Sequence, residues 1–159
     1  MMENETHKKI LFKYYSDYLD EVVSETMWAE IIDLEKGLFK LDNIPFFGPL
    51  IATDDIFYAE YDETEAKFMH KKTIQNSGNS IIQIAILEKG FDAAVIREKL
   101  KAINCLSEAL NETFFAAEIA KDVDYSLVRS ILNEYESQEI IEFAEPCLSE
   151  KHRADLLKN

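Results

Sequence analysis

The stretch that decides the fold of the second half of the chain is residues 80–103, SIIQIAILEKGFDAAVIREKLKAI. Its isoleucine-rich beginning, Ser80–Leu87, has the length and the β-branched content of a buried strand. Lys89-Gly90 interrupts this run, and Asp92 is well placed to cap a helix over 93–103. One face of that helix carries three apolar residues at helical spacing, namely Ile96, Leu100 and Ile103. The sequence therefore predicts a strand followed by an amphipathic helix.

The residues that follow repeat this alternation of strand and helix. Thr113–Ala120 is apolar enough for a strand, and Asp122 or Asp124 can cap a second helix. That helix is indicated by apolar residues at helical spacing: Leu127, Val128, Ile131, Leu132 and Tyr135. A last strand is expected around 140–143, before Pro146.

The segment Cys105–Leu110 leaves two alternatives, because it can prolong the first helix or form a strand of its own. If it is a strand, the order of elements is β-α-β-β-α-β, which is the ferredoxin-like order. We predict a ferredoxin-like subdomain over residues 79–148 on this basis. The remaining residues, 149–159, are expected to form a polar tail that is frayed or a short helix.

The first half, residues 8–78, has the pattern of a β-rich subdomain. Five short runs rich in apolar and aromatic residues are separated by polar or glycine-containing turns: 9–15, 25–33, 38–41, 56–61 and 66–74. Two prolines exclude a regular central strand over Ile44–Pro49. Short strands with tight turns predict a small curled β-sheet, for which we expect an SH3-like barrel. The whole chain is thus expected to have an α+β fold.

The composition is that of a folded globular protein with a strong acidic excess. The 159 residues include 17 Lys and Arg against 31 Asp and Glu, giving a formal net charge of -14. Such a charge argues against binding to nucleic acid or to an anionic membrane. It favours attraction to a basic protein partner.

The cysteines and the first residues point to a cytoplasmic protein. Cys105 and Cys147 are far apart and fit no metal-binding spacing, so we expect two free thiols, with one disulfide as the alternative. The opening residues MMENETHKK place acids before bases, unlike a secretory signal. No apolar run approaches the ~20 residues of a membrane span.

No motif in the sequence predicts a catalytic, cofactor or metal site. Patterns for a nucleophile elbow, a phosphate-binding loop or a dinucleotide fold are missing. His7, His70 and His152 stand apart from potential ligands, and two of them fall in terminal segments. Adjacent carboxylates such as Asp54-Asp55 and Asp62-Glu63 arise by chance in so acidic a chain and indicate solvated surface. We therefore expect no enzyme activity and no cofactor.

Four motifs along the chain carry a resemblance to a known family. They are Met27-Trp28-Ala29-Glu30, Gly37-Leu38-Phe39-Lys40-Leu41-Asp42-Asn43-Ile44-Pro45-Phe46-Phe47, Asp54-Asp55 before Ala59-Glu60, and Ser77-Gly78-Asn79-Ser80. The pattern resembles an uncharacterised bacterial family of small proteins, a domain of unknown function. Asn79 departs from it, because many relatives carry histidine there. Members are similar in size and charge to immunity proteins encoded beside bacterial polymorphic toxins.

This resemblance implies an acidic immunity protein that binds a cognate toxin domain, basic and nuclease-like, and neutralises it sterically. Acids bracketing the strand at 56–61, with two tyrosines as anchors, are the expected contact residues: Asp54, Asp55, Tyr58, Tyr61, Asp62, Glu63 and Glu65. One alternative is a regulatory ferredoxin-like module that forms a homodimer or binds a small ligand. A small hydrolase that uses carboxylates and a metal is the least favoured alternative. The sequence leaves open whether the protein is a monomer or a homodimer.

Overall fold

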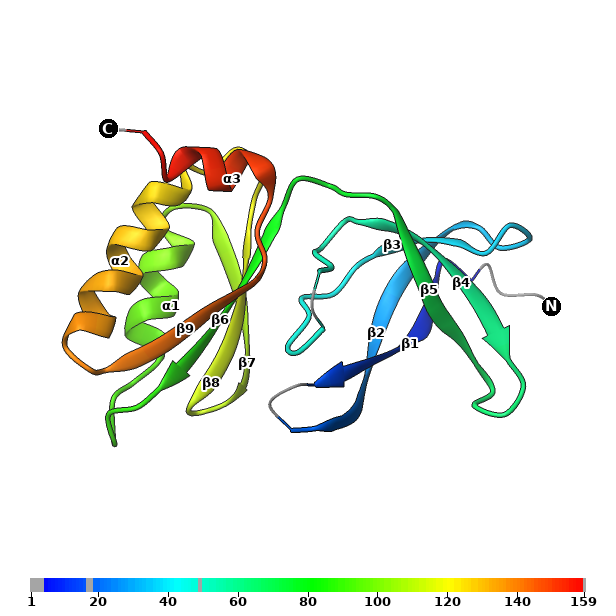
Figure 1. Ribbon diagram of the computed structural model, residues 1–159, viewed down its shortest axis with the longest axis horizontal. Coiled ribbons are helices and arrows are strands. Elements are labelled where there is room, and N and C mark those ends of the chain that lie inside the picture. The colour runs from blue at the N-terminus through cyan, green and yellow to red at the C-terminus, as the bar shows by residue number, and fades with distance from the viewer. Residues whose placement is uncertain (1–4, 17–18, 49, 159) are drawn as a thin grey trace. The chain divides into compact units, whose positions relative to one another are not determined.

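The computed structural model describes residues 5–16, 19–48 and 50–158 (Figure 1). The chain divides into two compact units, Met1–Ser77 and Gly78–Asn159, each with a hydrophobic core of its own. The first unit is built from strands, and the second combines strands with helices. The structure is mostly β-sheet with few helices, in two largely antiparallel sheets. The coarse prediction of an α+β fold is therefore confirmed.

Five strands form a closed barrel in the first unit: β1 (His7–Ser16), β2 (Glu21–Asp33), β3 (Leu38–Leu41), β4 (Ile56–Asp62) and β5 (Lys67–Gln75). Consecutive strands pair antiparallel, whereas β1 and β5 pair parallel at Ile10–Phe68 and Leu11–Met69. The parallel pair follows from the odd number of strands, because the first and last strands of a five-stranded meander run in the same direction. The short β1–β5 pair closes the sheet into a barrel.

The interior of the barrel is filled by the inward-pointing residues of each strand, as the two-residue period of a strand requires. The buried set is Ile10, Phe12, Met27, Ala29, Phe39, Leu41, Ile51, Phe57 and Ala59. Phe57 lies at the centre of an aromatic cluster, with ring centroids 5.4 Å from Phe12 and 5.9 Å from Phe39. Burial of each such side chain stabilises the fold by about 1.5–3 kcal/mol.

The Asp-Asn-Ile-Pro-Phe-Phe motif ties the connection between β3 and β4 to strand β2. The Asn43 side-chain oxygen accepts a hydrogen bond from the Trp28 backbone N–H at 3.2 Å. The Glu25 carboxylate accepts backbone N–H groups from Phe46 at 2.7 Å and from Gly48 at 3.0 Å. The carboxylate thus accepts hydrogen bonds from backbone groups of an irregular loop, which must all find acceptors.

The second unit contains β6 (Ser80–Ile86), α1 (Ala94–Lys101), β7 (Cys105–Asn111), β8 (Phe114–Ile119), α2 (Tyr125–Ser137), β9 (Ile141–Cys147) and α3 (Glu150–Asp155). The four strands form one antiparallel sheet in the order β7-β8-β6-β9. Of the two alternatives for residues 105–110, the structure adopts the strand. Asn104, in the left-handed region at φ 64°, lies between α1 and β7.

Helices α1 and α2 lie against one face of this sheet (Figure 1). The core between them is formed by alternate residues of β6 and β8 and by the apolar faces of the helices, and it includes Ile82, Ile84, Ile96, Leu100, Phe115, Val128 and Leu132. Asp124 is the N-cap of α2, and its side chain accepts the Ser126 N–H at 3.0 Å. None of the helices in the described ranges is long and apolar enough to cross a membrane.

The C-terminal segment, for which the sequence predicts a polar tail, includes the helix α3. Ser149 caps this helix by accepting the His152 N–H at 3.1 Å. His152 and Asp155 are buried, so one side of the helix faces the protein. Leu156, at the end of α3, packs against the core of the second unit. The sequence does not predict this buried face, because two of the residues that form it, His152 and Asp155, are polar.

Candidate functional site

The residues expected to contact a partner fall on two separate parts of the barrel. Tyr58 and Tyr61 lie on β4, Asp62 ends that strand, and Glu63 and Glu65 lie in the turn before β5. Asp54 and Asp55 precede β4, at its other end. The predicted patch therefore separates into a hairpin group and a loop pair, which have different roles.

Asp55 is a structural residue and is not available to a partner, which corrects the prediction. Its side chain is only 1% exposed. The carboxylate accepts the backbone N–H of Ala52 at 3.0 Å and that of Ser77 at 2.8 Å. Burial raises the pKa of Asp55, although these hydrogen bonds favour the charged form. Asp55 thus links Ser77, which follows β5, to Ala52 in the loop that leads into β4.

Asp54 is exposed, and it adopts a left-handed backbone conformation with φ 67°. Its N–H donates to the Leu41 carbonyl oxygen at 2.8 Å, and the Leu41 N–H donates to the Asp55 carbonyl oxygen at 2.9 Å. Aspartate tolerates the left-handed region better than most residues, which explains its presence in this turn. The backbone of Asp54 therefore extends the barrel, while its side chain faces outward.

The two tyrosines lie on opposite sides of β4, because residues 58 and 61 are separated by an odd number of positions. The Tyr58 hydroxyl donates to a carboxylate oxygen of Glu60 at 2.9 Å, and this hydrogen bond raises the Tyr58 pKa. Tyr61 is 56% exposed, and its ring packs edge-on against Phe68 with centroids 5.4 Å apart. The structure does not bring the two tyrosines together into one anchor.

The turn of the β4–β5 hairpin holds the remaining predicted acids. An Asp62 carboxylate oxygen accepts the Glu65 N–H at 2.9 Å and shapes the turn. Glu65 accepts a hydrogen bond from the Lys13 ammonium at 2.8 Å, and Glu63 is exposed at the tip. Glu60 was missed by sequence reasoning, although it alternates with Asp62 on the strand. We call Glu60, Asp62, Glu63 and Glu65 the hairpin acids.

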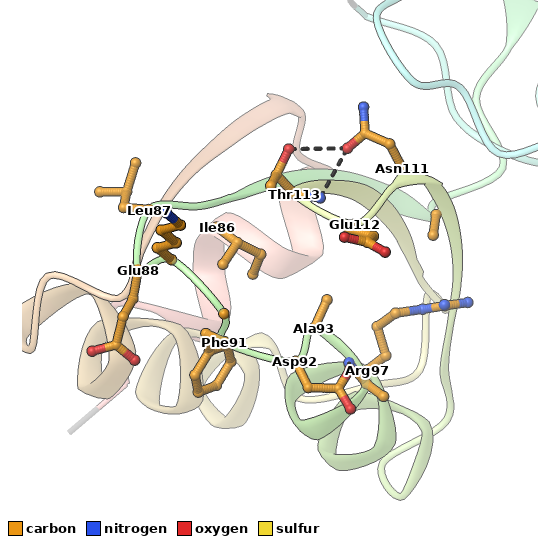
Figure 2. Close-up of a pocket in the computed structure, with 14 residues that line it drawn as sticks. Ile86, Leu87, Glu88, Phe91, Asp92, Ala93, Arg97, Asn111, Glu112 and Thr113 are labelled. Carbon is orange, nitrogen blue, oxygen red and sulfur yellow. Dashed lines mark hydrogen bonds between the residues drawn. The ribbon is translucent and has the colours of Figure 1, made fainter.

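A cavity with a volume of about 860 Å³ lies in the second unit (Figure 2). It is bounded by the segment between β6 and α1 and by the turn between β7 and β8. Ile86, Phe91 and Ala93 supply apolar lining. Figure 2 shows Asp92 and Arg97 on the side of α1 and Glu112 on the turn between β7 and β8.

Hydrogen bonds fix the polar residues around this cavity. The Arg97 side chain donates from Nε to the Ser107 hydroxyl at 2.8 Å and from Nη2 to the Ser107 carbonyl oxygen at 3.2 Å. The Asn111 side-chain oxygen accepts both the N–H and the hydroxyl of Thr113, at 2.9 and 3.0 Å. Asp92 accepts the Ala94 N–H at 3.0 Å. A pocket with an apolar floor and fixed charges of both signs suits a small polar ligand.

Sequence reasoning could not find this cavity, because its lining comes from three segments that no local pattern connects. The sequence does carry a weaker signal, in that Lys89-Gly90 and Asn111-Glu112 mark the two turns that form its rim.

Ser80 and His152 form a buried pair, and neither side chain is exposed. The His152 Nε2 atom faces the Ala120 carbonyl oxygen at 3.1 Å and must carry the proton that it donates. Nδ1 is then an acceptor for the Ser80 hydroxyl at 2.6 Å. Burial lowers the pKa of His152, which favours this neutral form. The pair connects α3 to β6, so His152 lies in the short helix that was one of the two alternatives for this segment and is buried there.

The described residues contain no group of three or more His, Cys, Asp or Glu side chains placed to hold a metal ion. Cys105 and Cys147 are not joined by a disulfide, the alternative that the sequence had left open. Burial raises the pKa of Cys105 to about 12, so its thiolate is strongly disfavoured.

Residues 25–143 match the family model described as "Domain of unknown function (DUF4265)". The chain belongs to this family. The matched DUF4265 segment starts in β2 and ends in β9, so it includes residues of both units. Membership of an uncharacterised family is thus confirmed, whereas a link of DUF4265 to immunity proteins stays a prediction.

The comparison with solved structures finds a chain described as a hypothetical protein from Neisseria gonorrhoeae. It is similar to this DUF4265 protein with a TM-score of 0.79 and 23% sequence identity, over 92% of this chain and 99% of that chain. At this identity the likeness establishes the fold alone. No curated protein matches the sequence.

Proposed function

We propose that this DUF4265 protein is a cytoplasmic immunity protein that binds a basic bacterial toxin domain and neutralises it sterically. The observation that carries the proposal is the group of hairpin acids on β4 and in the turn before β5, together with the exposed ring of Tyr61 on the same strand. Two of these acids, Glu60 and Glu63, are exposed and have no ion-pair partner among the described residues. They are free to meet cations of a partner.

The charge of the whole chain supports the same proposal. A protein with a net charge of -14 attracts a basic partner over distances of about the Debye length, roughly 8–10 Å at physiological salt. Such steering raises the rate of association, while an exposed aromatic side chain such as Tyr61, once covered by the partner, supplies affinity at short range. Inhibition on this model needs no catalytic residue, because occupying the substrate groove of the toxin is sufficient.

We also propose a finer classification of the two units. The five-stranded meander closed by a parallel pair supports an SH3-like barrel for the first unit. The order β-α-β-β-α-β, with strands arranged β7-β8-β6-β9, supports a ferredoxin-like second unit. Both are common scaffolds for binding, and neither prescribes a chemistry.

A second candidate function is regulation by a small ligand in the second unit. The 860 Å³ cavity favours it, because its volume falls in the range of small-molecule sites and Arg97 offers a fixed cationic group. A homodimeric form of such a module is part of this candidate.

The test compares two charge-reversal variants in the native host. The variant Glu60→Lys with Glu63→Lys alters the hairpin acids, and the control Glu134→Lys with Glu136→Lys makes the same change in net charge on exposed positions of α2. Partners that co-purify at low salt are identified and expressed alone, and growth is measured with and without each variant. A toxic partner that the wild type and the control neutralise, but the hairpin variant does not, supports the proposal. Equal protection by both variants would exclude the hairpin as the contact site.

A further inference from the structure

A row of three exposed side chains crosses the outside of the barrel near one of its ends. Trp28 on β2 is directly opposite Lys9 on β1. Lys9 is next to Lys67 on β5, because the following residues of these two strands, Ile10 and Phe68, are paired. Ile10 points into the core, so the residues before it and before Phe68 point outward.

This row borders a recess of about 280 Å³ at the end of the barrel. The recess combines cationic and aromatic lining residues, among them Lys8, Lys9, Lys67, Trp28, Tyr61 and Phe68. It also contains Glu5 and His7, whose side chains contact other residues. Glu5 forms an ion pair with Lys8 at 3.0 Å, and the His7 imidazole is 2.8 Å from the Asp42 carboxylate.

Lys9 and Lys67 have no carboxylate partner among the described residues. The Lys9 ammonium lies 5.2 Å from the centre of the Trp28 ring, a weak cation–π contact. Asp62 is opposite Lys67 in the β4–β5 register, but its carboxylate accepts the Glu65 N–H. Like charges on neighbouring strands repel each other, so two adjacent unpaired lysines lower the stability of the barrel. In a chain with 31 acids, this arrangement is unexpected for a purely structural surface.

The aromatic residues of the recess are also unusually accessible. Trp28 is 47% exposed and Tyr61 is 56% exposed. An exposed ring offers a stacking surface to a planar ligand, and such stacking is insensitive to the identity of the base. Phe68 and Tyr61 both line the recess and pack edge to face.

We propose that this recess binds a nucleoside phosphate, with the base stacked against Trp28 or Tyr61 and the phosphate between Lys9 and Lys67. Neighbouring strands lie about 4.8 Å apart, so the row from Trp28 to Lys67 spans about 10 Å. A base and a phosphate joined by one sugar can span this length. Two ammonium groups on adjacent strands can converge on a single phosphate and neutralise it. The site shares Tyr61 with the proposed toxin contact but differs from it in chemistry, because it recognises an anion.

The test uses the fluorescence of Trp28, since the chain contains one tryptophan. Full-length protein is titrated with AMP, adenosine, ribose 5-phosphate and a single-stranded oligonucleotide, and calorimetry gives an independent Kd. We expect AMP to change the fluorescence saturably and to bind at least tenfold more tightly than adenosine or ribose 5-phosphate. Equal binding of adenosine and AMP would overturn the proposal, as would no binding of AMP at millimolar concentration. Preferential binding of the oligonucleotide would overturn it in favour of single-stranded nucleic acid.

Variants locate the site. We expect Lys9→Gln and Lys67→Gln each to weaken AMP binding about tenfold, the effect of one hydrogen bond to a charged group. Lys72→Gln is the matched control, because Lys72 is an exposed lysine on the same strand β5 outside the recess. Thermal unfolding of each variant confirms that it is folded. AMP affinity that is unchanged in both recess variants would assign the binding to another site and overturn the proposal.

Discussion

The Ser80 hydroxyl and the Nδ1 atom of His152 lie 2.6 Å apart in the interior of the second unit, although 72 positions separate them in the sequence. The hydroxyl oxygen also accepts the Ser149 N–H at 2.9 Å. Ser80, at the start of β6, therefore forms hydrogen bonds with both Ser149, the N-cap of α3, and His152, within that helix. The second unit is closed by a polar contact between its first strand and its last helix.

This contact predicts that the second unit loses stability in mild acid. The His152 pKa is lowered in the folded state, so the native structure favours the neutral ring. Its contribution is complete above the unfolded pKa of about 6.5 and is lost as the pH falls through the folded pKa. We expect the melting temperature of wild type to fall below pH 6.5, and less so in His152→Gln.

The control for this prediction is His70, the other histidine whose pKa burial lowers. It belongs to the barrel, where its ring stacks on Phe12 with centroids 4.9 Å apart. Hydrogen exchange in α3 distinguishes the two, because only His152→Gln removes the acid dependence of exchange there. The same dependence in wild type and His152→Gln would contradict the assignment.

Substitution of Asp55 is expected to destabilise the protein more than substitution of an exposed acid nearby. Asp55→Ala removes the acceptor of the N–H groups of Ala52, which is buried, and of Ser77, which is half-buried. We expect a decrease of about 2 kcal/mol in the free energy of unfolding, measured with denaturant. Glu63→Ala, at the exposed tip of the hairpin, serves as the control and should change it by less than about 0.5 kcal/mol.

The contrast between Asp54 and Asp55 shows what the sequence can and cannot predict. The alternation of apolar residues predicts the strands and amphipathic helices, because burial acts on one face at a time. Two adjacent aspartates look identical in such a pattern, yet one is exposed and the other is buried under Ser77, 22 positions away. Contacts of this kind depend on the tertiary fold, as do the Ser80–His152 pair and the cavity around Arg97. The fold class was therefore predictable, and the roles of individual polar residues were not.

The hydrogen bonds of Glu25 predict that the conformation of the loop after β3 depends on this one carboxylate of β2. Glu25→Ala removes the acceptor of backbone N–H groups at Phe46, Phe47 and Gly48. We expect about 2 kcal/mol of destabilisation and faster amide exchange at residues 46–48. Glu30→Ala, at an exposed position of the same strand, is the matched control and should leave that exchange unchanged. Similar exchange in both variants would show that the loop is held by other contacts.

Alanine substitutions at Gly37 and Gly90 distinguish two causes of destabilisation, namely backbone strain and steric overlap. Both glycines adopt the left-handed region, at φ 69° and 82°, so alanine is strained at either position by about 1–2 kcal/mol. A Cβ atom at Gly37 would also overlap the Ala59 carbonyl oxygen and lie 3.0 Å from the Tyr58 ring, whereas at Gly90 it would meet nothing within 4 Å. The carbonyl oxygen of Gly37 also accepts the Ala59 N–H at 2.9 Å, so a shift of the Gly37 backbone breaks a hydrogen bond of the barrel.

We therefore expect Gly37→Ala to reduce the free energy of unfolding by at least about 2 kcal/mol more than Gly90→Ala, measured by denaturant unfolding. Equal effects would mean that β4 moves away from the turn at little cost, which is inconsistent with a barrel closed around Phe57.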